Sequence, residues 1–177
     1  MLENDSILLR AVEPEDIDFL YRCENDTDLW RYGTTIVPYS RYAIKQYIAE
    51  TQNDIYTDRQ LRLIITRKDK GEAVGAVDLF DFDPFHLRAA VGIAIVGDEN
   101  RRLGFASQTL QLLVDYSFDF LHLHQLYCTV AADNVPSLHI FEKAGFERCG
   151  LRKEWIKTAD GFADVVEMQL VNRSGKE

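Results

Sequence analysis

The middle of the chain contains three consecutive strand-like segments, and this run constrains the fold more than any other part of the sequence. Each segment is rich in aliphatic and β-branched residues, and a turn at Lys70 and Gly71 separates the first from the second. The segments are LRLIITR at 61–67, AVGAVDLFDF at 73–82 and LRAAVGIAIV at 87–96. They predict an antiparallel meander, so we expect a β-sheet at the centre of the molecule.

Further strands and helices are predicted on both sides of this sheet. Pro14 and Ser40 stand where helices begin, and Gly145 is a natural end for another helix. The predicted strands outside the meander are 6–12, 126–132, 147–156 and 162–170, and the predicted helices start near residues 14, 41, 104 and 135. The order is βααβββαβαββ, an α/β (α+β) arrangement. Because 177 residues suit a single core, we expect one domain over 1–172 and a flexible tail at 173–177.

The charge of the chain narrows the classes of partner. A net charge of -9 argues against nucleic acid, because binding to phosphates needs a concentrated Lys/Arg face. The same charge is compatible with a cationic substrate, although a surface that is acidic for solubility is the favoured explanation.

The cysteines and the N-terminal segment indicate the compartment. Cys23, Cys128 and Cys149 match no metal-site or disulfide spacing, so we expect buried, reduced thiols and no bound metal. The first ten residues lack the features of a signal peptide, and no apolar run is long enough to cross a membrane. The sequence therefore predicts a cytoplasmic protein without a membrane partner.

A glycine-containing loop precedes the helix predicted at 104–121. The N-terminus of a helix leaves backbone N–H groups unpaired and carries partial positive charge, which suits a phosphate. Gly104 and Ala106 keep this turn thin, while Arg101 and Arg102 offer charged hydrogen bonds. The alternative is an ordinary loop with one glycine and two solvated arginines.

Two motifs resemble those of the GNAT N-acetyltransferases. Arg101, Gly104 and Ala106 fit the R-x-x-G-x-A form of that family's acetyl-CoA loop, and the segment NVPSLHIFEKAGF at 134–146 resembles its second signature. The resemblance covers essentially the whole chain. It implies the GNAT fold with a mixed central sheet, acetyl-CoA as cosubstrate, and direct transfer of an acetyl group to a primary amine without a covalent enzyme intermediate.

The resemblance also implies a set of coenzyme contacts. Backbone groups of Ile95 and Val96 would pair with the pantetheine arm, in a V between two splayed strands. The pyrophosphate would rest on the backbone N–H groups of Arg101, Arg102, Leu103, Gly104, Phe105, Ala106 and Ser107. Asn134, Ser137 and Lys143 would complete the site. Each has another explanation, since strand residues pack in any core, Asn134 can cap its helix, and Lys143 can be a solvated surface residue.

Two catalytic positions depart from the family pattern. Phe141 stands where many members carry a tyrosine acid, so Ser137, Tyr127 or a water must protonate the leaving thiolate. Ala90 stands where many carry a glutamate base. Asp78 is our first choice for the base or for amine binding. Because side chains alternate along a strand, Asp78 and Asp81 are expected on opposite faces, with Asp81 and Asp83 as turn residues.

In this family the first helices, the loop between them and the last hairpin bind the acceptor amine. Here these segments supply Glu24, Trp30, Tyr32 and Tyr39, together with Trp155, although aromatic residues of this kind also form cores.

Within the family, the chain resembles the bacterial spermidine/spermine N-acetyltransferases. The likeness lies in the pattern Asp83, His86, Arg88, Ala89 and in the pairs Arg31-Tyr32 and Pro38-Tyr39. A polyamine is therefore the favoured acceptor, although 34–37 lacks the acidic residues of that group. The missing tyrosine at Phe141 keeps two alternatives open, a ribosomal-protein N-terminal acetyltransferase and a catalytically silent acyl-CoA-binding module. Relatives of the polyamine type often form homo-oligomers.

Overall fold

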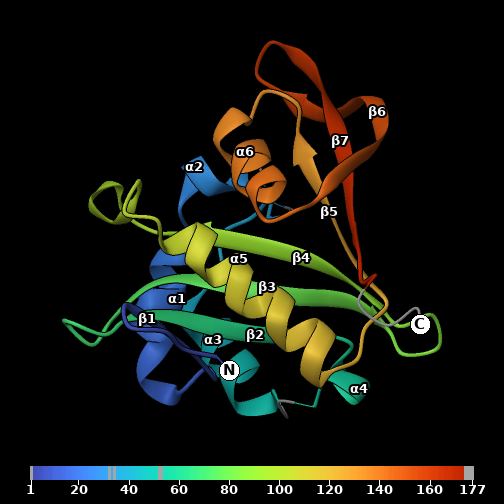
Figure 1. The fold of residues 1–177 in the computed structure, drawn as a ribbon. Helices are drawn as coiled ribbons and strands as arrows, with labels where there is room; N and C mark the ends of the chain where they lie inside the picture. Colours follow the sequence, from blue (N-terminus) through green and yellow to red (C-terminus); the bar gives the residue numbers. More distant parts are fainter. Residues whose placement is uncertain (1, 32, 34, 52–53, 174–177) are drawn as a thin grey trace.

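The computed structural model describes residues 2–31, 33, 35–51 and 54–173. A mixed seven-stranded sheet runs through the molecule in the order β1-β2-β3-β4-β5-β7-β6 (Figure 1). Its strands are β1 (Ile7–Arg10), β2 (Leu61–Arg67), β3 (Glu72–Asp83), β4 (Arg88–Ile95), β5 (Gln125–Ala131), β6 (Glu147–Thr158) and β7 (Gly161–Val171). Only β4 and β5 pair in parallel among the named strands of the described chain. The predicted meander is confirmed as β2–β3–β4.

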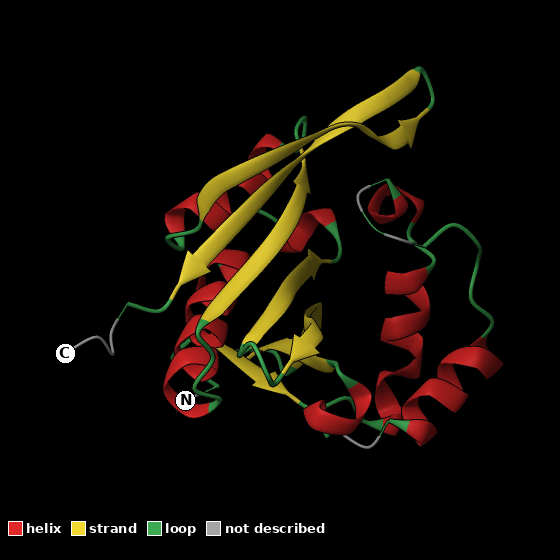
Figure 2. Cartoon of the chain, turned by 90° about the vertical axis from the view of Figure 1, so that its right-hand side faces the viewer, coloured by secondary structure: helices red, strands yellow, loops and turns green. Residues whose placement is uncertain are grey.

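The helices lie on both sides of the sheet (Figures 1 and 2). The α-helices are α1 (Ile17–Glu24), α2 (Thr27–Trp30), α3 (Arg41–Glu50), α4 (Ile55–Asp58), α5 (Phe105–Asp115) and α6 (Val135–Lys143). Helix α5 crosses one face of the sheet, whereas α1 and α3 cover the other. The π-helical turn η3 (Tyr116–Phe120) extends α5, so the long helix predicted from residue 104 is present with an irregular last turn.

Each face of the sheet has its own apolar core. On the α5 face, Leu110 and Leu113 pack with β-strand residues such as Val77 and Leu126. On the other face, Leu20 of α1 joins the cluster that holds α1 and α3 against β2. Apolar burial on both faces fixes the register of the central strands, because a shift by one residue would exchange their two sides.

Two short helices were absent from the sequence prediction. Helices α2 and α4 each span a single turn, and the side chains of Asp26 and Asp54 cap them by accepting a backbone N–H. One turn carries too few residues for an apolar period, so capping chemistry was their only signal.

Other expectations concern the thiols, membrane spans and the chain end. Cys23 and Cys128 are buried, and burial raises the pKa of each thiol to about 12. Cys149 is exposed on β6, so the expectation that it is buried was wrong. In the part of the chain that the structure describes, no helix is long and apolar enough to span a bilayer. Most of the predicted tail lies outside the described residues.

Candidate active site

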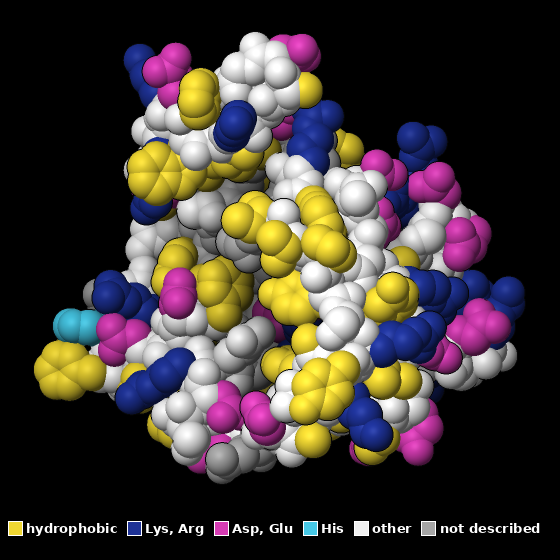
Figure 3. Space-filling view, turned by 180° about the vertical axis from the view of Figure 1, so that it is seen from behind, with side chains coloured by type: hydrophobic (Ala, Val, Ile, Leu, Met, Phe, Trp, Pro, Cys, Tyr) yellow, Lys and Arg dark blue, Asp and Glu magenta, His cyan; other side chains and the backbone are white. Residues whose placement is uncertain are grey.

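Strands β4 and β5 separate and leave a V between them. Arg88–Ala90 pair with Gln125–Tyr127, and the pairing between the two strands stops there. Ala90 and Tyr127 thus form the last rung before the strands diverge. The space-filling view shows the surface hollowed beneath the lobe that carries β6 and β7 (Figure 3).

The backbone of β4 presents alternate residues to this V. The N–H of Val96 donates to the carbonyl of Val74 at 2.9 Å, so Val96 faces β3. Along a strand of an antiparallel pair, every second residue directs its N–H and C=O to the partner strand, and the residues between them direct theirs to the other side. The backbone groups of Val91, Ile93 and Ile95 therefore point into the V. The carbonyl of Val96 accepts from the side chain of Asn100 at 2.8 Å. The prediction for Ile95 is thus compatible with the structure, whereas the prediction for Val96 was wrong.

The loop after β4 leads into an open helix N-terminus. Gly104 is the N-cap residue of α5 with φ +81°, and no side chain caps the helix. A Cβ at Gly104 would meet only the side chain of Gln108, at 3.6 Å, so the positive φ rather than crowding requires glycine there. The first helical hydrogen bond runs from the N–H of Gln108 to the Gly104 carbonyl. The N–H groups of Phe105, Ala106 and Ser107 precede it, where a helix has no internal acceptor for them.

The residues before Gly104 contribute less directly. Arg101 forms an ion pair with Asp98 at 2.8 Å, and its backbone N–H donates to the Asp98 carbonyl at 3.2 Å. Arg102 has a positive φ of 63°, and the Leu103 side chain is about half exposed. The uncapped backbone N–H groups are therefore in the first turn of α5, whereas the Arg101 guanidinium is engaged by Asp98 and would have to leave it to reach a phosphate.

Helix α6 lies across the V from α5. The side-chain oxygen of Asn134 accepts from the Ser137 N–H at 3.3 Å, so Asn134 caps the helix, as its alternative explanation held. Ser137 is half-buried one turn onward, and Lys143 is exposed in the last turn. Phe141 is 3% exposed and its ring meets that of Phe146 edge-on, with the centroids 5.1 Å apart. A phenylalanine in this position offers no proton.

An ion-paired triad lies on the face of the sheet that α1 and α3 cover. Arg62 of β2 binds both carboxylate oxygens of Asp78 on β3, at 2.8 and 3.0 Å, and reaches Glu24 at the end of α1 at 2.5 Å. Each side chain is only about one-fifth exposed. Burial alone would lower the pKa of Arg62, but the charges of Asp78 and Glu24 raise it. The triad carries a net charge of one negative unit, and Asp78 is held by its neighbours.

Two other predicted acceptor residues, Trp30 and Tyr39, lie next to the end of α1. Trp30 donates its indole N–H to the backbone carbonyl of Glu24 at 2.7 Å, which fixes the end of α1. Tyr39 is exposed and bonds to the side chain of Asn25 through its backbone. Tyr32 lies outside the described residues.

Trp155 and Arg31 make contacts outside the triad. Trp155, on the outer strand β6, is exposed and its ring lies 4.8 Å from the guanidinium of Arg152. Arg31 forms an ion pair with Asp133 at 2.6 Å. This pair joins the segment after α2 to the turn before α6.

Sequence reasoning missed Arg62. An arginine next to the aliphatic residues of a covered strand is a signal for a buried partner, because a charge there must be paired. The sequence does not reveal that partner, since Arg62 and Asp78 are opposed by the β2–β3 register.

Comparison with known proteins defines the class of the chain. A model of the acetyltransferase (GNAT) domain matches residues 6–147, so the protein belongs to the GNAT acetyltransferases, a family that uses acyl-CoA as donor. It is 27% identical over 168 residues to spermidine N(1)-acetyltransferase of Vibrio cholerae serotype O1, covering 95% of this chain and 94% of that protein. The match to spermidine N(1)-acetyltransferase of Escherichia coli K12 is 30% over 141 residues, or 80% and 73% of the two chains.

A solved structure shows the same fold. The crystal structure of spermidine N-acetyltransferase from Vibrio cholerae in complex with CoA and spermine has a TM-score of 0.83 with this chain, at 27% identity over 95% of this chain and 96% of that one. The GNAT fold expected from the two motifs is thereby confirmed, and this chain is a GNAT N-acetyltransferase.

Arg101→Ala is expected to weaken acetyl-CoA binding by about 1–3 kcal/mol, the scale of a hydrogen bond to a charged group. Asp98→Ala removes the carboxylate that competes for Arg101 and serves as the matched control, with binding equal to or tighter than in the unmodified protein. Titration calorimetry measures both. Equal affinity in Arg101→Ala and the unmodified protein would remove Arg101 from the coenzyme site.

Proposed function

We propose that the protein transfers the acetyl group of acetyl-CoA directly to a primary amine, and that the favoured acceptor is a polyamine such as spermidine. The proposal depends on one observation, namely that a site suited to the coenzyme and a site suited to a cationic amine occur in the same structure. An anion-binding helix N-terminus and a V-shaped gap suit the coenzyme, and an anionic triad beside them suits a cationic acceptor.

The coenzyme contacts in this proposal follow the geometry of the V. Ile95 and its alternate neighbours offer backbone groups to the pantetheine arm, and the first turn of α5 offers N–H groups to the pyrophosphate. The amide nitrogen of Asn134 remains available as a donor after its oxygen has capped α6, and Ser137 and Lys143 lie further along that helix. Acetyl-CoA supplies an activated acyl carbon when it is bound.

Glu24 and Asp78 bind the acceptor in this proposal. Their two negative charges exceed the single positive charge of Arg62, so the triad attracts one ammonium group of a multiply charged amine. Tyr39 and Trp30 border the entrance with aromatic surface, which favours cations. The prediction that Asp78 also removes a proton stays a prediction, and its bidentate pairing with Arg62 favours binding over proton transfer.

The first test is release of free thiol from acetyl-CoA by the purified protein, against spermidine, spermine, short diamines, aminoglycosides and peptides with free N-termini. Turnover fastest on spermidine is the expected result, because a multiply charged amine engages the triad while one nitrogen reacts. Turnover on peptides alone would contradict a polyamine acceptor and favour the N-terminal acetyltransferase alternative. The lack of a hydroxyl at Phe141 supports that alternative. Coenzyme binding without turnover on any amine would favour the silent binding module.

Self-association is part of the proposal. The β6 strand is the edge of the sheet beyond β7, and an edge strand offers backbone groups to a second copy of the chain. We therefore propose a homo-oligomer that assembles through this edge.

A further inference from the structure

A β-bulge re-aims one acidic side chain of β3. Phe80 pairs with Ala90 and Asp83 pairs with Arg88, so two residues of β3 stand opposite one residue of β4. Asp81 lies in this bulge with φ +49°, a left-handed conformation that few residues other than glycine adopt. Residue alternation is lost there, and the expectation that Asp81 and Asp78 face opposite sides was wrong.

The burial pattern shows how the bulge changes the faces. Phe82 packs into the core on the α5 side, together with Leu79, although the strict alternation of a strand would separate these two residues. Phe80 and Asp81 are both exposed in consequence. Asp81 lies close enough to Tyr127 to act on it electrostatically, because the pKa of Tyr127 is raised by burial and by the charge of Asp81.

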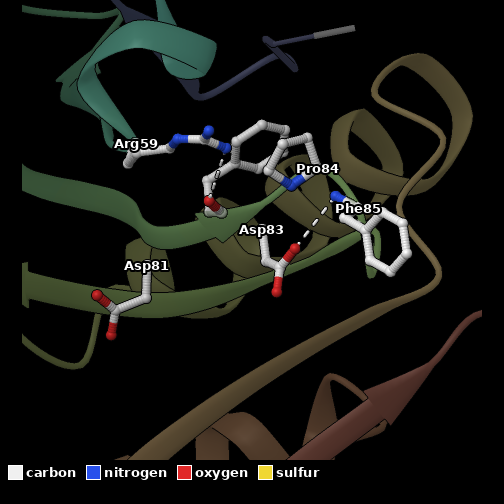
Figure 4. Close-up of a pocket in the computed structure, with 6 residues that line it drawn as sticks. Arg59, Asp81, Asp83, Pro84 and Phe85 are labelled. Carbon is white, nitrogen blue, oxygen red and sulfur yellow. Dashed lines mark hydrogen bonds between the residues drawn. The ribbon is translucent and has the colours of Figure 1, made fainter.

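Asp81 differs from its acidic neighbours because its carboxylate has no hydrogen-bond or ion-pair partner among the residues that the structure describes. Asp78 is held by Arg62, and Asp83 accepts from the N–H groups of Phe85 and His86 and pairs with Arg88. Arg59 shares an open depression of about 470 Å³ with Asp81, but its guanidinium is directed to the carbonyl of Phe82. In Figure 4 the Asp81 carboxylate points away from that of Asp83.

The position of Asp81 coincides with the apex of the V. Strand residues rise about 3.3 Å each, so the stretch from Val96 back to Val91 spans about 16 Å, on the scale of an extended pantetheine arm. A coenzyme with its phosphates at the start of α5 therefore carries its acyl group to the last rung, Ala90 and Tyr127. Asp81 directly follows Phe80, the residue of β3 that pairs with Ala90 of this rung.

We propose that Asp81 is the catalytic carboxylate that binds and deprotonates the reacting amine, while the triad of Glu24, Arg62 and Asp78 holds a distal ammonium group. This inference rests on the proposed function. Asp81 first takes a proton from the bound ammonium and passes it to solvent, and the neutral amine nitrogen then forms a bond to the acyl carbon as the carbon–sulfur bond breaks. The surplus proton on nitrogen passes to Asp81 and then to solvent, and the thiolate takes a proton from Tyr127, which solvent replaces.

Asp81→Asn tests the proposal because asparagine has the same shape and also tolerates a positive φ. We expect kcat/KM for spermidine to fall about 100-fold, the scale of general-base catalysis, with acetyl-CoA affinity unchanged. Calorimetry should also show weaker binding of spermidine to the CoA-loaded protein. Asp119→Asn, the same charge change on the turn after α5, is the matched control and should leave both quantities unchanged.

Asp81→Gly is a second variant that we expect to fold normally, because glycine adopts a positive φ without strain. It should be at least as stable as the unmodified protein and as impaired as Asp81→Asn. If the unmodified protein is active and Asp81→Asn keeps full turnover and full spermidine binding, the role of Asp81 would be overturned while the proposed function would stand. An unmodified protein that binds CoA and turns over no amine would overturn the proposed function itself.

Discussion

Replacing Arg62 with alanine should lower the free energy of unfolding by about 3 kcal/mol. The change leaves Glu24 and Asp78 facing each other as two mostly buried carboxylates without the guanidinium that joins them. Their mutual repulsion and lost hydrogen bonds both act on the folded state, whereas in the unfolded chain water solvates them. Urea denaturation monitored by tryptophan fluorescence measures the free energy of unfolding of both proteins.

A surface ion pair provides the matched control for this variant. Arg152 pairs with Glu167 between β6 and β7, where both side chains are at least one-third exposed. Arg152→Ala should cost less than about 1 kcal/mol, because exposed pairs are weak. If Arg62→Ala cost no more than Arg152→Ala, the triad would be no stronger than a surface pair.

Phe141→Ala should reduce the free energy of unfolding by about 3–4 kcal/mol, because it removes a buried ring and leaves a cavity. Phe141 contacts Phe146 edge-on within the core that joins α6 to the sheet. Phe85 is 85% exposed at the tip between β3 and β4, and Phe85→Ala should stay within about 0.5 kcal/mol of the unmodified protein. Similar losses in the two variants would contradict the packing role of Phe141.

Phe141→Tyr separates the packing of this ring from its chemistry. The variant keeps the ring but places a hydroxyl in apolar surroundings, so we expect a loss of about 1–3 kcal/mol and no gain in kcat. A higher kcat would show that the hydroxyl reaches the leaving thiolate. In that case the position would supply the acid that many family members have there.

The sequence predicted the main elements because each has a periodic apolar pattern. Strand β2 was predicted with its observed bounds, and Gly145 ends α6 with φ +93°, as expected for a left-handed residue. Gly104 was also predicted at the start of α5, and the structure adds that it has a positive φ there. These features depend on local physical chemistry, which a sequence displays without knowledge of what packs against it.

The acceptor side was less accessible to prediction. Asp78 was singled out, but its pairing with Arg62 depends on the register between two strands, which no local pattern encodes. The bulge at Asp81 has the same origin, because it arises where β3 and β4 fall out of step. Sequence reasoning assumed an unbroken two-residue period from Asp78 to Asp81 and therefore placed the two residues on opposite faces.

The last rung of the V also divides the chain into two parts. Glu24, Arg62 and Asp78 all precede Ala90 in sequence, whereas Gly104 and Asn134 follow it. Under the proposed function, the acidic groups that bind the amine therefore come from the first half of the chain, and the helix termini that bind the coenzyme come from the second. If the proposal holds, substitutions of Glu24, Arg62 or Asp78 can change the choice of amine during evolution without altering the backbone at the start of α5 or α6.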